Sequence, residues 1–319
     1  MLFITKRLIN CQLGINFDRF IYINHKILVM KNYFIISCMT VVSMIACQNE
    51  DTALLENSEL NTKTEDMKRQ GQNSFEAYPQ QKGILKKAFL NGEEISYEEI
   101  NNELVYQGDI ILNPDMLSTV KGNSTERTGI RGEQYRWKNK RVYYSINPDL
   151  PAKQRVIDAI AHVEANTDIR FIERTTQTNY IYFNKGQGCS SYIGKQGGKQ
   201  NITLNITCST GAAIHEIGHA LGLFHEQSRL DRNDFLTIKW NNIEDGYQHN
   251  FKTWQTLGYN GFDLGDNLDF NSIMLYGPYS FSKNGRPTIT KKDGSLYNSN
   301  YSQLSQGDIT TIAFMYRNE

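Results

Sequence analysis

Three histidines and one glutamate lie within the short stretch from His215 to His225. On a helix, His215 and His219 are four residues apart, so both imidazoles lie on one face and can bind the same metal ion. Glu216 follows the first histidine, where its carboxylate can reach a metal-bound water and act as a general base. Gly222 can adopt the left-handed conformation that ends a helix, which lets the chain return His225 to the metal. Three histidines and one open position are typical of a catalytic zinc site, since structural zinc usually has four protein ligands.

Two alternatives follow from the same residues. The first alternative is that the histidines are ordinary helix residues. A chance match to the whole motif, including Gly222 and His225, is disfavoured in a chain with only six histidines. Three imidazoles also suit cobalt, copper or nickel. We expect one catalytic zinc ion as the cofactor, bound by His215, His219 and His225.

Two further stretches, Glu226 to Arg229 and Ser272 to Tyr276, follow the third histidine. Together with the histidine stretch they resemble the astacin family of metzincin zinc metallopeptidases. In that family the Ser-x-Met-x-Tyr segment forms a tight turn beneath the metal. The resemblance implies that Met274 is the hydrophobic floor of the site and that Tyr276 is a further zinc ligand, which swings away to stabilise the oxyanion. Without the resemblance, both would be interpreted as core residues.

The resemblance extends from about Trp137 to the C-terminus and implies one disulfide, between Cys189 and Cys208. Asp168 and Arg317 stand where the family commonly has a second pair. The chain is therefore expected to be a one-disulfide variant, in which the remaining bridge contributes about 3 kcal/mol. The edge strand near Cys189 is expected to bind extended substrate through main-chain hydrogen bonds.

The hydrophobic pattern predicts an α+β fold for residues 128–319. Strands are expected at 141–146, 169–173, 180–184 and 201–206, and helices at 151–166, through the histidine motif and at about 306–316. Family resemblance implies a metzincin-like catalytic domain with a twisted, mixed and mostly antiparallel sheet. An active-site cleft then separates the sheet and the zinc helix from an irregular C-terminal half that carries Met274 and Tyr276.

The N-terminal region is typical of an exported protein. Residues 33–46 form an apolar run that is too short to span a bilayer and that ends at Cys47. We expect a signal peptide at 30–46, with 1–29 as a doubtful upstream extension or an unusually long start. Met44 to Cys47 resembles the lipobox of bacterial lipoproteins, which predicts a lipid on Cys47; an ordinary secretory cleavage site is the alternative. Both predict export, with a lipid-anchored precursor at the bacterial envelope or cell surface in the first case.

Residues 47–127 differ in composition and could be a linker or a small binding module. Tyr106 to Ile110 resembles the aromatic-x-Gly-Asp element of astacin propeptides, in which the aspartate occupies the open position of the zinc in the zymogen. The resemblance implies that residues 47–127 are a propeptide with Cys47 at its start. It makes Asp109 the zymogen switch, because a carboxylate there removes the nucleophilic water. A surface turn at Gly108 and Asp109 is the competing interpretation.

Comparison with the start of mature astacins places the mature N-terminus at Thr128, after Arg127. In the family the freed ammonium group is buried against the glutamate that follows the third histidine, here Glu226. Because a buried carboxylate without a partner is unfavourable, this pair would form only after cleavage.

Together these features predict an exported zinc endopeptidase that is made as a zymogen and is activated by another protease or by autolysis. Glu216 and Tyr276 would be its catalytic residues, proteins or peptides its substrates, and a monomer its expected state. Alternatives are a surface-anchored, zinc-containing peptide-binding protein and a zinc exopeptidase. With 34 basic and 34 acidic residues and no basic run with interleaved aromatics, the chain lacks the charge pattern of a nucleic-acid-binding protein. Membrane contact is expected only through the lipid.

Overall fold

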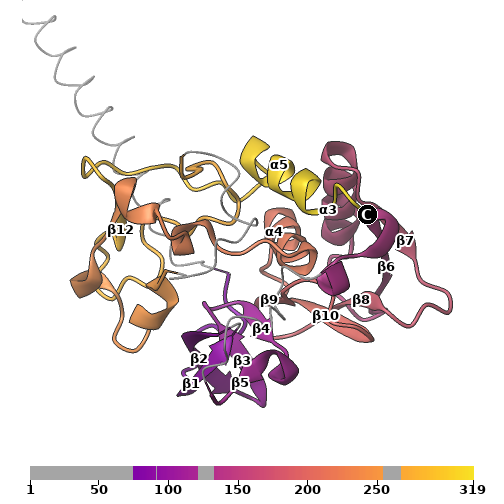
Figure 1. Cartoon of the computed structure of the whole chain (residues 1–319), viewed down its shortest axis with the longest axis horizontal. Coiled ribbons are helices and arrows are strands. Elements are labelled where there is room, and N and C mark those ends of the chain that lie inside the picture. The colour runs from indigo at the N-terminus through magenta and orange to yellow at the C-terminus, as the bar shows by residue number, and fades with distance from the viewer. Residues whose placement is uncertain (1–74, 91, 121–132, 254–266) are drawn as a thin grey trace, which may run out of the picture. The chain divides into compact units, whose positions relative to one another are not determined.

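A computed structural model describes residues 75–90, 92–120, 133–253 and 267–319 (Figure 1). The chain divides into two compact units, Met1–Lys63 and Thr64–Glu319, and all described residues belong to the second. The expected upstream extension (1–29), signal peptide (30–46), Cys47 and Thr128 lie outside the described residues. Within the described ranges, no helix has the length and apolar character needed to cross a membrane.

Five strands of the C-terminal body, defined here as residues 133–319, form one half of a mixed sheet. The strands are β6 (Arg141–Ile146), β7 (Arg170–Glu173), β8 (Tyr180–Asn184), β9 (Cys189–Tyr192) and β10 (Lys199–Leu204). Their order is β9-β10-β8-β6-β7, and all neighbours are parallel except β9 and β10. The antiparallel strand β9 therefore forms the edge of this half. The expected mixed sheet is confirmed, although most of its pairs within the body are parallel.

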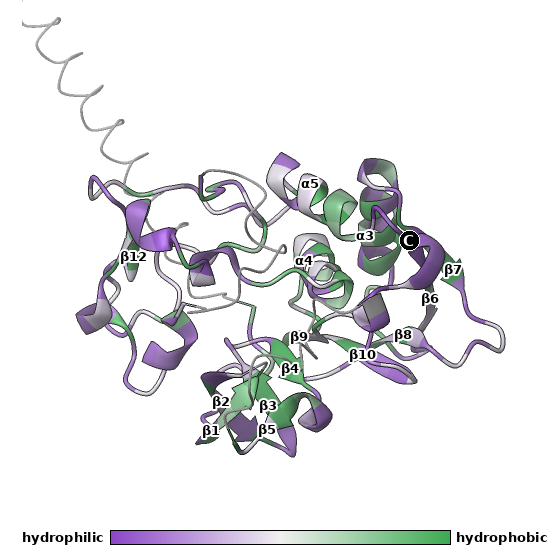
Figure 2. Ribbon diagram, viewed as in Figure 1, coloured by the Kyte–Doolittle hydropathy of each residue, from purple (hydrophilic) through white to green (hydrophobic). Residues whose placement is uncertain are grey.

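The other half of the sheet comes from the N-terminal module, defined as the described residues between 75 and 120. Its strands are β1 (Ile84–Leu90), β2 (Glu93–Ile100), β3 (Glu103–Tyr106), β4 (Ile110–Leu112) and β5 (Leu117–Ser118). Neighbours within the module pair in antiparallel fashion, whereas β4 pairs in parallel with β9. The module thus extends the sheet from the β9 edge, with apolar residues along β4 at the junction (Figure 2).

Helix α3 (Gln154–Asn166) packs beside α4 (Thr210–Leu221) (Figure 1). The apolar face of α3 is buried, with Val156, Ala159 and Val163 each 0% exposed. The sequence predicts that this helix begins at Pro151, and the structure corrects the start to Gln154. Ala152 has a φ of 49°, which lies outside the right-handed helical region and keeps the preceding residues in a turn.

Other boundaries also differ from the prediction, and strand β10 begins at Lys199 and not at Asn201. Strand β10 ends at Leu204 and not at Ile206, because Asn205 begins a turn in which its side chain accepts a hydrogen bond from the Thr207 amide. Strand β7 and the last helix, α5 (Gln306–Met315), are each one residue shorter than expected.

Both ends of α4 are fixed by identifiable contacts. At the start, the Ser209 hydroxyl accepts a hydrogen bond from the Ala212 amide. At the end, Gly222 has a φ of 108°, which confirms the left-handed residue that the sequence predicts there. Buried Trp137 donates to the Ala220 carbonyl at 2.9 Å and Tyr316 donates to the Leu221 carbonyl at 3.0 Å. These aromatic donors satisfy carbonyl groups that a helix end otherwise leaves unpaired.

Among the described residues beyond Phe224 the chain is mostly irregular, as expected, and includes a small ladder between β11 (Leu236–Ile238) and β12 (Ile289–Lys291). Short 3-10 turns precede and follow this ladder's first strand: η5 (Glu226–Ser228), η6 (Arg232–Asp234), η7 (Trp240–Asn242) and η8 (Gln248–Phe251). The α+β fold with a histidine-bearing helix and an irregular C-terminal half is therefore confirmed.

Arg155 of α3 provides a test of how the connection between β10 and α4 is held. Its guanidinium group is buried and donates to carbonyl groups of Pro151, Leu204, Asn205, Ile206 and Cys208. Truncation would leave these carbonyls without the guanidinium donor, including those of Leu204 and Cys208, whose contacts are buried. We expect Arg155→Ala to lower the free energy of unfolding by about 2 to 4 kcal/mol, measured by urea denaturation.

The matched control is Lys153→Ala, which removes an exposed cation two residues away and is expected to change the unfolding free energy by less than about 0.5 kcal/mol. Equal urea midpoints for the two variants would show that the guanidinium group does not hold this connection.

Candidate metal centre

Four buried side chains meet at one point beside α4: His215, His219, His225 and Asp109. The Asp109 carboxylate lies 3.2 Å from Nε2 of His215, 3.5 Å from Nε2 of His219 and 3.2 Å from Nε2 of His225. All four ligand atoms lie within 4.8 Å of one another. Ligand atoms arranged tetrahedrally around a zinc ion are about 3.3 Å apart, given zinc–ligand bonds of about 2.0–2.1 Å. The cluster therefore has the dimensions of a single zinc site.

In each of the three histidines, the second ring nitrogen, Nδ1, faces an oxygen that can only accept a hydrogen bond. Nδ1 of His215 lies 2.8 Å from the Ile273 carbonyl, and Nδ1 of His219 lies 2.7 Å from the Leu223 carbonyl. Nδ1 of His225 lies 3.2 Å from the side-chain oxygen of Gln107. Because each Nδ1 must donate, each neutral ring turns the lone pair of Nε2 toward Asp109, as metal-bound histidines do.

The electrostatics of the cluster favour a bound cation. Burial lowers the pKa values of His215, His219 and His225, which keeps these rings neutral. Among the described residues, Nε2 of His219, Nε2 of His225 and one Asp109 oxygen have no hydrogen-bond partner. Buried lone pairs of this kind are stabilised by a metal ion, and this donor set fits zinc.

Glu216 lies on α4 directly after the first histidine and is 0% exposed. Within the described part of the chain, neither of its carboxylate oxygens has a hydrogen-bond partner. Burial, with a contribution from the Asp109 charge, raises the pKa of Glu216 well above its ordinary value. A buried carboxyl group without structural partners contributes no stability, and a raised pKa is typical of groups that transfer protons.

The turn at Ser272 to Leu275 lies against α4 and supports the first histidine. Met274 is buried, and its sulfur would lie 2.9 Å from a Cβ atom placed on Gly218, so the glycine lets the turn approach the helix. Asp308 of α5 fixes this turn by accepting hydrogen bonds from the Ser272 hydroxyl at 2.7 Å and the Ile273 amide at 3.0 Å. The Ile273 carbonyl in turn orients His215.

Tyr276 lies beside the third histidine, with its ring centre 4.7 Å from that of His225. Its hydroxyl donates to the main-chain carbonyl of Gln107 at 2.6 Å. In this arrangement the phenol is engaged by the N-terminal module, so its role as a zinc ligand stays a prediction.

The N-terminal module contacts β9 through its main chain, in addition to the contacts of Asp109 with the histidines. The Asp109 carbonyl accepts from the Ser191 amide at 3.1 Å, and the Glu76 carbonyl accepts from the Cys189 amide at 2.8 Å. The edge strand that was expected to bind substrate is therefore paired with two segments of the same chain. The segment that carries Asp109 is no solvent-exposed turn, since Gln107 and Asp109 are each 0% exposed.

Glu226 follows the third histidine and is largely buried. Burial raises the pKa of its carboxyl group to about 8. The carboxylate accepts a hydrogen bond from the Asp269 amide at 2.9 Å and lies 3.5 Å from the Arg229 guanidinium. Its expected partner, Thr128, lies outside the described residues, so the pairing of Glu226 with the mature N-terminus stays a prediction.

The expected disulfide between Cys189 and Cys208 is present and joins β9 to the turn before α4. At the position of the second family disulfide, Asp168 instead forms an exposed ion pair with Lys140 at 2.9 Å. The bridge therefore anchors the start of the edge strand that pairs with the N-terminal module.

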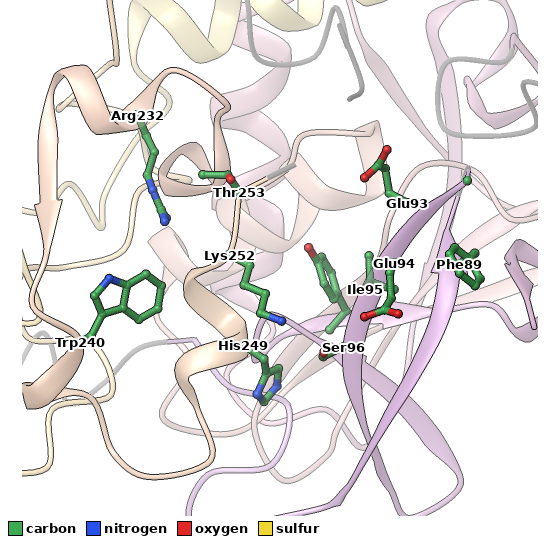
Figure 3. A pocket seen from close by; sticks show the side chains of 12 residues that line it. Phe89, Glu93, Glu94, Ile95, Ser96, Arg232, Trp240, His249, Lys252 and Thr253 are labelled. Atoms are coloured by element: carbon green, nitrogen blue, oxygen red, sulfur yellow. The ribbon is translucent and has the colours of Figure 1, made fainter. Parts of the chain in front are cut away.

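A cavity of about 610 Å³ lies between the N-terminal module and the C-terminal body. Arg232, Trp240 and Lys252 of the body line one side, and Glu93 and Glu94 of the module line the other (Figure 3). The two parts are therefore separated at this place, whereas they meet closely at β9 and at the metal centre.

Comparison with protein families matches residues 129–317 to the Astacin peptidase family. The fold and the His-His-His-Asp cluster define a metzincin-like zinc protein. The chain belongs to the astacin family of zinc-dependent metallopeptidases.

Individual relatives agree with this assignment. Blastula protease 10 of Paracentrotus lividus is 39% identical over 233 residues, which cover 66% of this chain and 38% of that protein. Astacin-like metalloprotease toxin 1 of Loxosceles intermedia is 38% identical over 191 residues, covering 58% of this chain and 71% of the toxin. The structure of High choriolytic enzyme 1, a hatching enzyme zinc-protease from Oryzias latipes, is similar with a TM-score of 0.52 and 31% identity, over 58% of this chain and 94% of that one. This chain thus spans less than half of the Paracentrotus protein.

Sequence reasoning missed two residues at the centre, Gln107 and Phe75. Gln107 contacts both His225 and Tyr276, yet it stands at the unspecified position of the aromatic-x-Gly-Asp element. Phe75 lies 4.5 Å from the His215 ring, measured between ring centres, although it is far from any motif in the sequence. No local pattern identifies either residue, because their roles depend on how the module docks.

The histidine cluster predicts a simple result for metal content. We expect the purified chain to hold one zinc ion and His219→Ala to lose most of it, because two imidazoles and a carboxylate bind zinc more weakly than three imidazoles and a carboxylate. Elemental analysis after dialysis measures this. His162→Ala, which removes a histidine outside the cluster, is the control, and equal zinc content in both variants would contradict the site.

Proposed function

We propose that the chain is a zinc-dependent endopeptidase made as a zymogen. The observation that carries this proposal is the convergence of three histidine Nε2 atoms on one buried point, with the unpartnered carboxylate of Glu216 on the same helix. A zinc ion bound there would polarise a peptide carbonyl and lower the pKa of a bound water. Glu216 would accept the proton of the attacking water and later return it to the leaving amine.

Tyr276 would stabilise the oxyanion that forms at the scissile carbonyl. Its phenol already donates to a main-chain carbonyl in the cleft, that of Gln107. When this segment leaves, the same donor becomes available to a substrate carbonyl, whose developing charge strengthens the hydrogen bond. Burial raises the pKa of Tyr276 well above its ordinary value, so the phenol stays protonated and able to donate.

The pairing of β9 supports cleavage within a chain rather than at its ends. The Glu76 carbonyl accepts a hydrogen bond from the Cys189 amide at the start of β9. Further along β9, Ser191 pairs with Ile110 and Tyr192 pairs with Ile111. The edge strand therefore accommodates extended main chain on both sides of the position that Asp109 occupies, as an endopeptidase requires. This arrangement supports an endopeptidase over an exopeptidase. The unpartnered Glu216 carboxylate argues against a binding protein with purely structural zinc.

The N-terminal module would be the inhibitory propeptide, with Asp109 holding the position needed by the attacking water. Cleavage between Arg127 and Thr128, by another protease or by autolysis, would release the catalytic domain at 128–319. The new ammonium group would then pair with the buried Glu226, whose raised pKa reflects its burial with few compensating charges.

Export is proposed from the sequence of the N-terminal region alone. A signal peptide at 30–46 and a lipid on Cys47 would place the precursor at a bacterial envelope or cell surface. Bacterial origin rests on the lipobox resemblance, while the three relatives named above come from animals. Proteins or peptides would be the substrates, and the mature domain would act as a monomer.

The assignment of Glu216 as the general base predicts a selective loss of activity. We expect Glu216→Gln to lower turnover of denatured casein by about 10²–10⁴-fold while the zinc content stays at the wild-type level, since the amide cannot accept the proton. Chelator treatment of the wild type serves as the metal-free control. Near-full activity of Glu216→Gln would show that another group takes the proton.

The role of Asp109 predicts activity without processing. In a chain that carries Arg127→Gln to prevent cleavage, we expect Asp109→Asn to raise hydrolysis of a short fluorogenic peptide at least tenfold. Loss of the carboxylate weakens docking of the module, and about 1.4 kcal/mol is enough to increase the open population tenfold.

The matched control for this test is Asp115→Asn, which changes an exposed aspartate of the same module. A similar rate for the Asp109→Asn and Asp115→Asn chains would mean that Asp109 does not inhibit the site.

A further inference from the structure

A second segment of the N-terminal module lies in the cleft, far in sequence from Asp109. We call residues 75–82 the strap. The Glu76 carbonyl accepts from the Cys189 amide of β9, and the Ala77 amide donates to the Gly108 carbonyl, both at 2.8 Å. The strap therefore lies between the start of the edge strand and the segment that carries the aspartate.

The far end of the strap is fixed to the irregular half of the body. The Tyr247 hydroxyl donates to the Gln81 carbonyl at 3.2 Å, and Lys82 forms an ion pair with Glu244 at 2.9 Å. These contacts are partly exposed and add little affinity. They show that the strap crosses from the metal centre to the opposite wall of the cleft.

Phe75 carries the most specific contact of the strap. Its ring centre lies 4.5 Å from that of His215 and 5.5 Å from that of Tyr301, and it meets the tyrosine edge-on at 87°. The main chain at Tyr301 lies directly against α4. A Cβ atom on Gly211 of this helix would lie only 1.6 Å from the Tyr301 carbonyl oxygen. The rings of His215 and Tyr301 both belong to the C-terminal body, and together they contact Phe75 next to the metal centre.

The body also leaves room for main chain beside this subsite. A Cβ atom on Gly188 would lie 1.8 Å from the Glu76 carbonyl oxygen and 2.7 Å from the Ala77 carbonyl oxygen. Any other residue at this position would exclude the strap from the start of β9. Gly188 belongs to the C-terminal body, so this room persists after the module has left and is open to another extended chain.

We propose that the subsite formed by His215 and Tyr301 binds an aromatic side chain of the substrate, in the place where Phe75 lies in the precursor. This inference rests on the proposed endopeptidase function and names its substrate class: extended polypeptides with phenylalanine or tyrosine close to the scissile bond. The main chain would use the Cys189 amide, as Glu76 does, and the aromatic ring would meet Tyr301 edge-on. Edge-to-face contacts favour an aromatic ring over an aliphatic side chain by about threefold to tenfold.

The cleavage test uses processed protein and a peptide series with one scissile bond. Phenylalanine, leucine or alanine is placed at each flanking position in turn, and kcat and KM are measured separately. We expect one position at which phenylalanine raises kcat/KM by about threefold to tenfold over leucine, mainly through KM. Tyr301→Leu should remove this preference and Tyr301→Phe should keep it. A preference that is absent in the wild type, or unchanged in folded, zinc-loaded Tyr301→Leu, would overturn the proposal.

A binding test keeps the subsite separate from the proposed activity. A synthetic peptide with the sequence of residues 75–82 is titrated into processed protein by calorimetry, beside the same peptide with Phe75→Ala. We expect the phenylalanine peptide to bind at least three times more tightly, and Tyr301→Leu to abolish the difference. Equal affinities would overturn the subsite even if the protein cleaves casein. Failure to cleave any substrate, together with unequal affinities, would instead refute the endopeptidase function and leave the subsite standing.

Discussion

The structure depends on one electrostatic constraint: three histidine lone pairs and one carboxylate are turned toward the same buried point. Such an arrangement is unfavourable unless a cation lies between the groups. The rings cannot turn away, because each Nδ1 donates to an oxygen that only accepts. Burial keeps the imidazoles neutral and therefore suited to a metal. The surrounding architecture holds the groups in this orientation.

That support comes from elements distant in the sequence. Trp137 and Tyr316 bind carbonyls at the end of α4, so the start of the body and its last helix fix the helix that bears two of the histidines. Asp308 caps α5 and also holds the turn whose carbonyl orients His215. Only the third histidine is oriented by the N-terminal module, through Gln107. Release of the module would therefore remove the Nδ1 partner of His225 but leave those of His215 and His219 in place.

Local sequence patterns predict the parts of the site that depend on helical spacing. The helix, its left-handed end at Gly222 and the grouping of three histidines follow from such spacing, and the structure shows them together. The start of α3 could not be predicted, because the left-handed Ala152 carries no sequence signal. Contacts of Gln107 and Phe75 were also beyond prediction, since they arise only when residues more than 100 positions apart dock. Contacts between residues so far apart leave no periodic pattern in the sequence from which they could be predicted.

We infer that Asp109 and the three histidines share one zinc ion in the uncleaved chain. Anomalous diffraction at the zinc edge from crystals of the zinc-loaded precursor would locate that ion. We expect one anomalous peak, bonded to Nε2 of His215, His219 and His225 and to the Asp109 carboxylate. A peak elsewhere, or a peak at the histidines with the Asp109 carboxylate turned away, would contradict it.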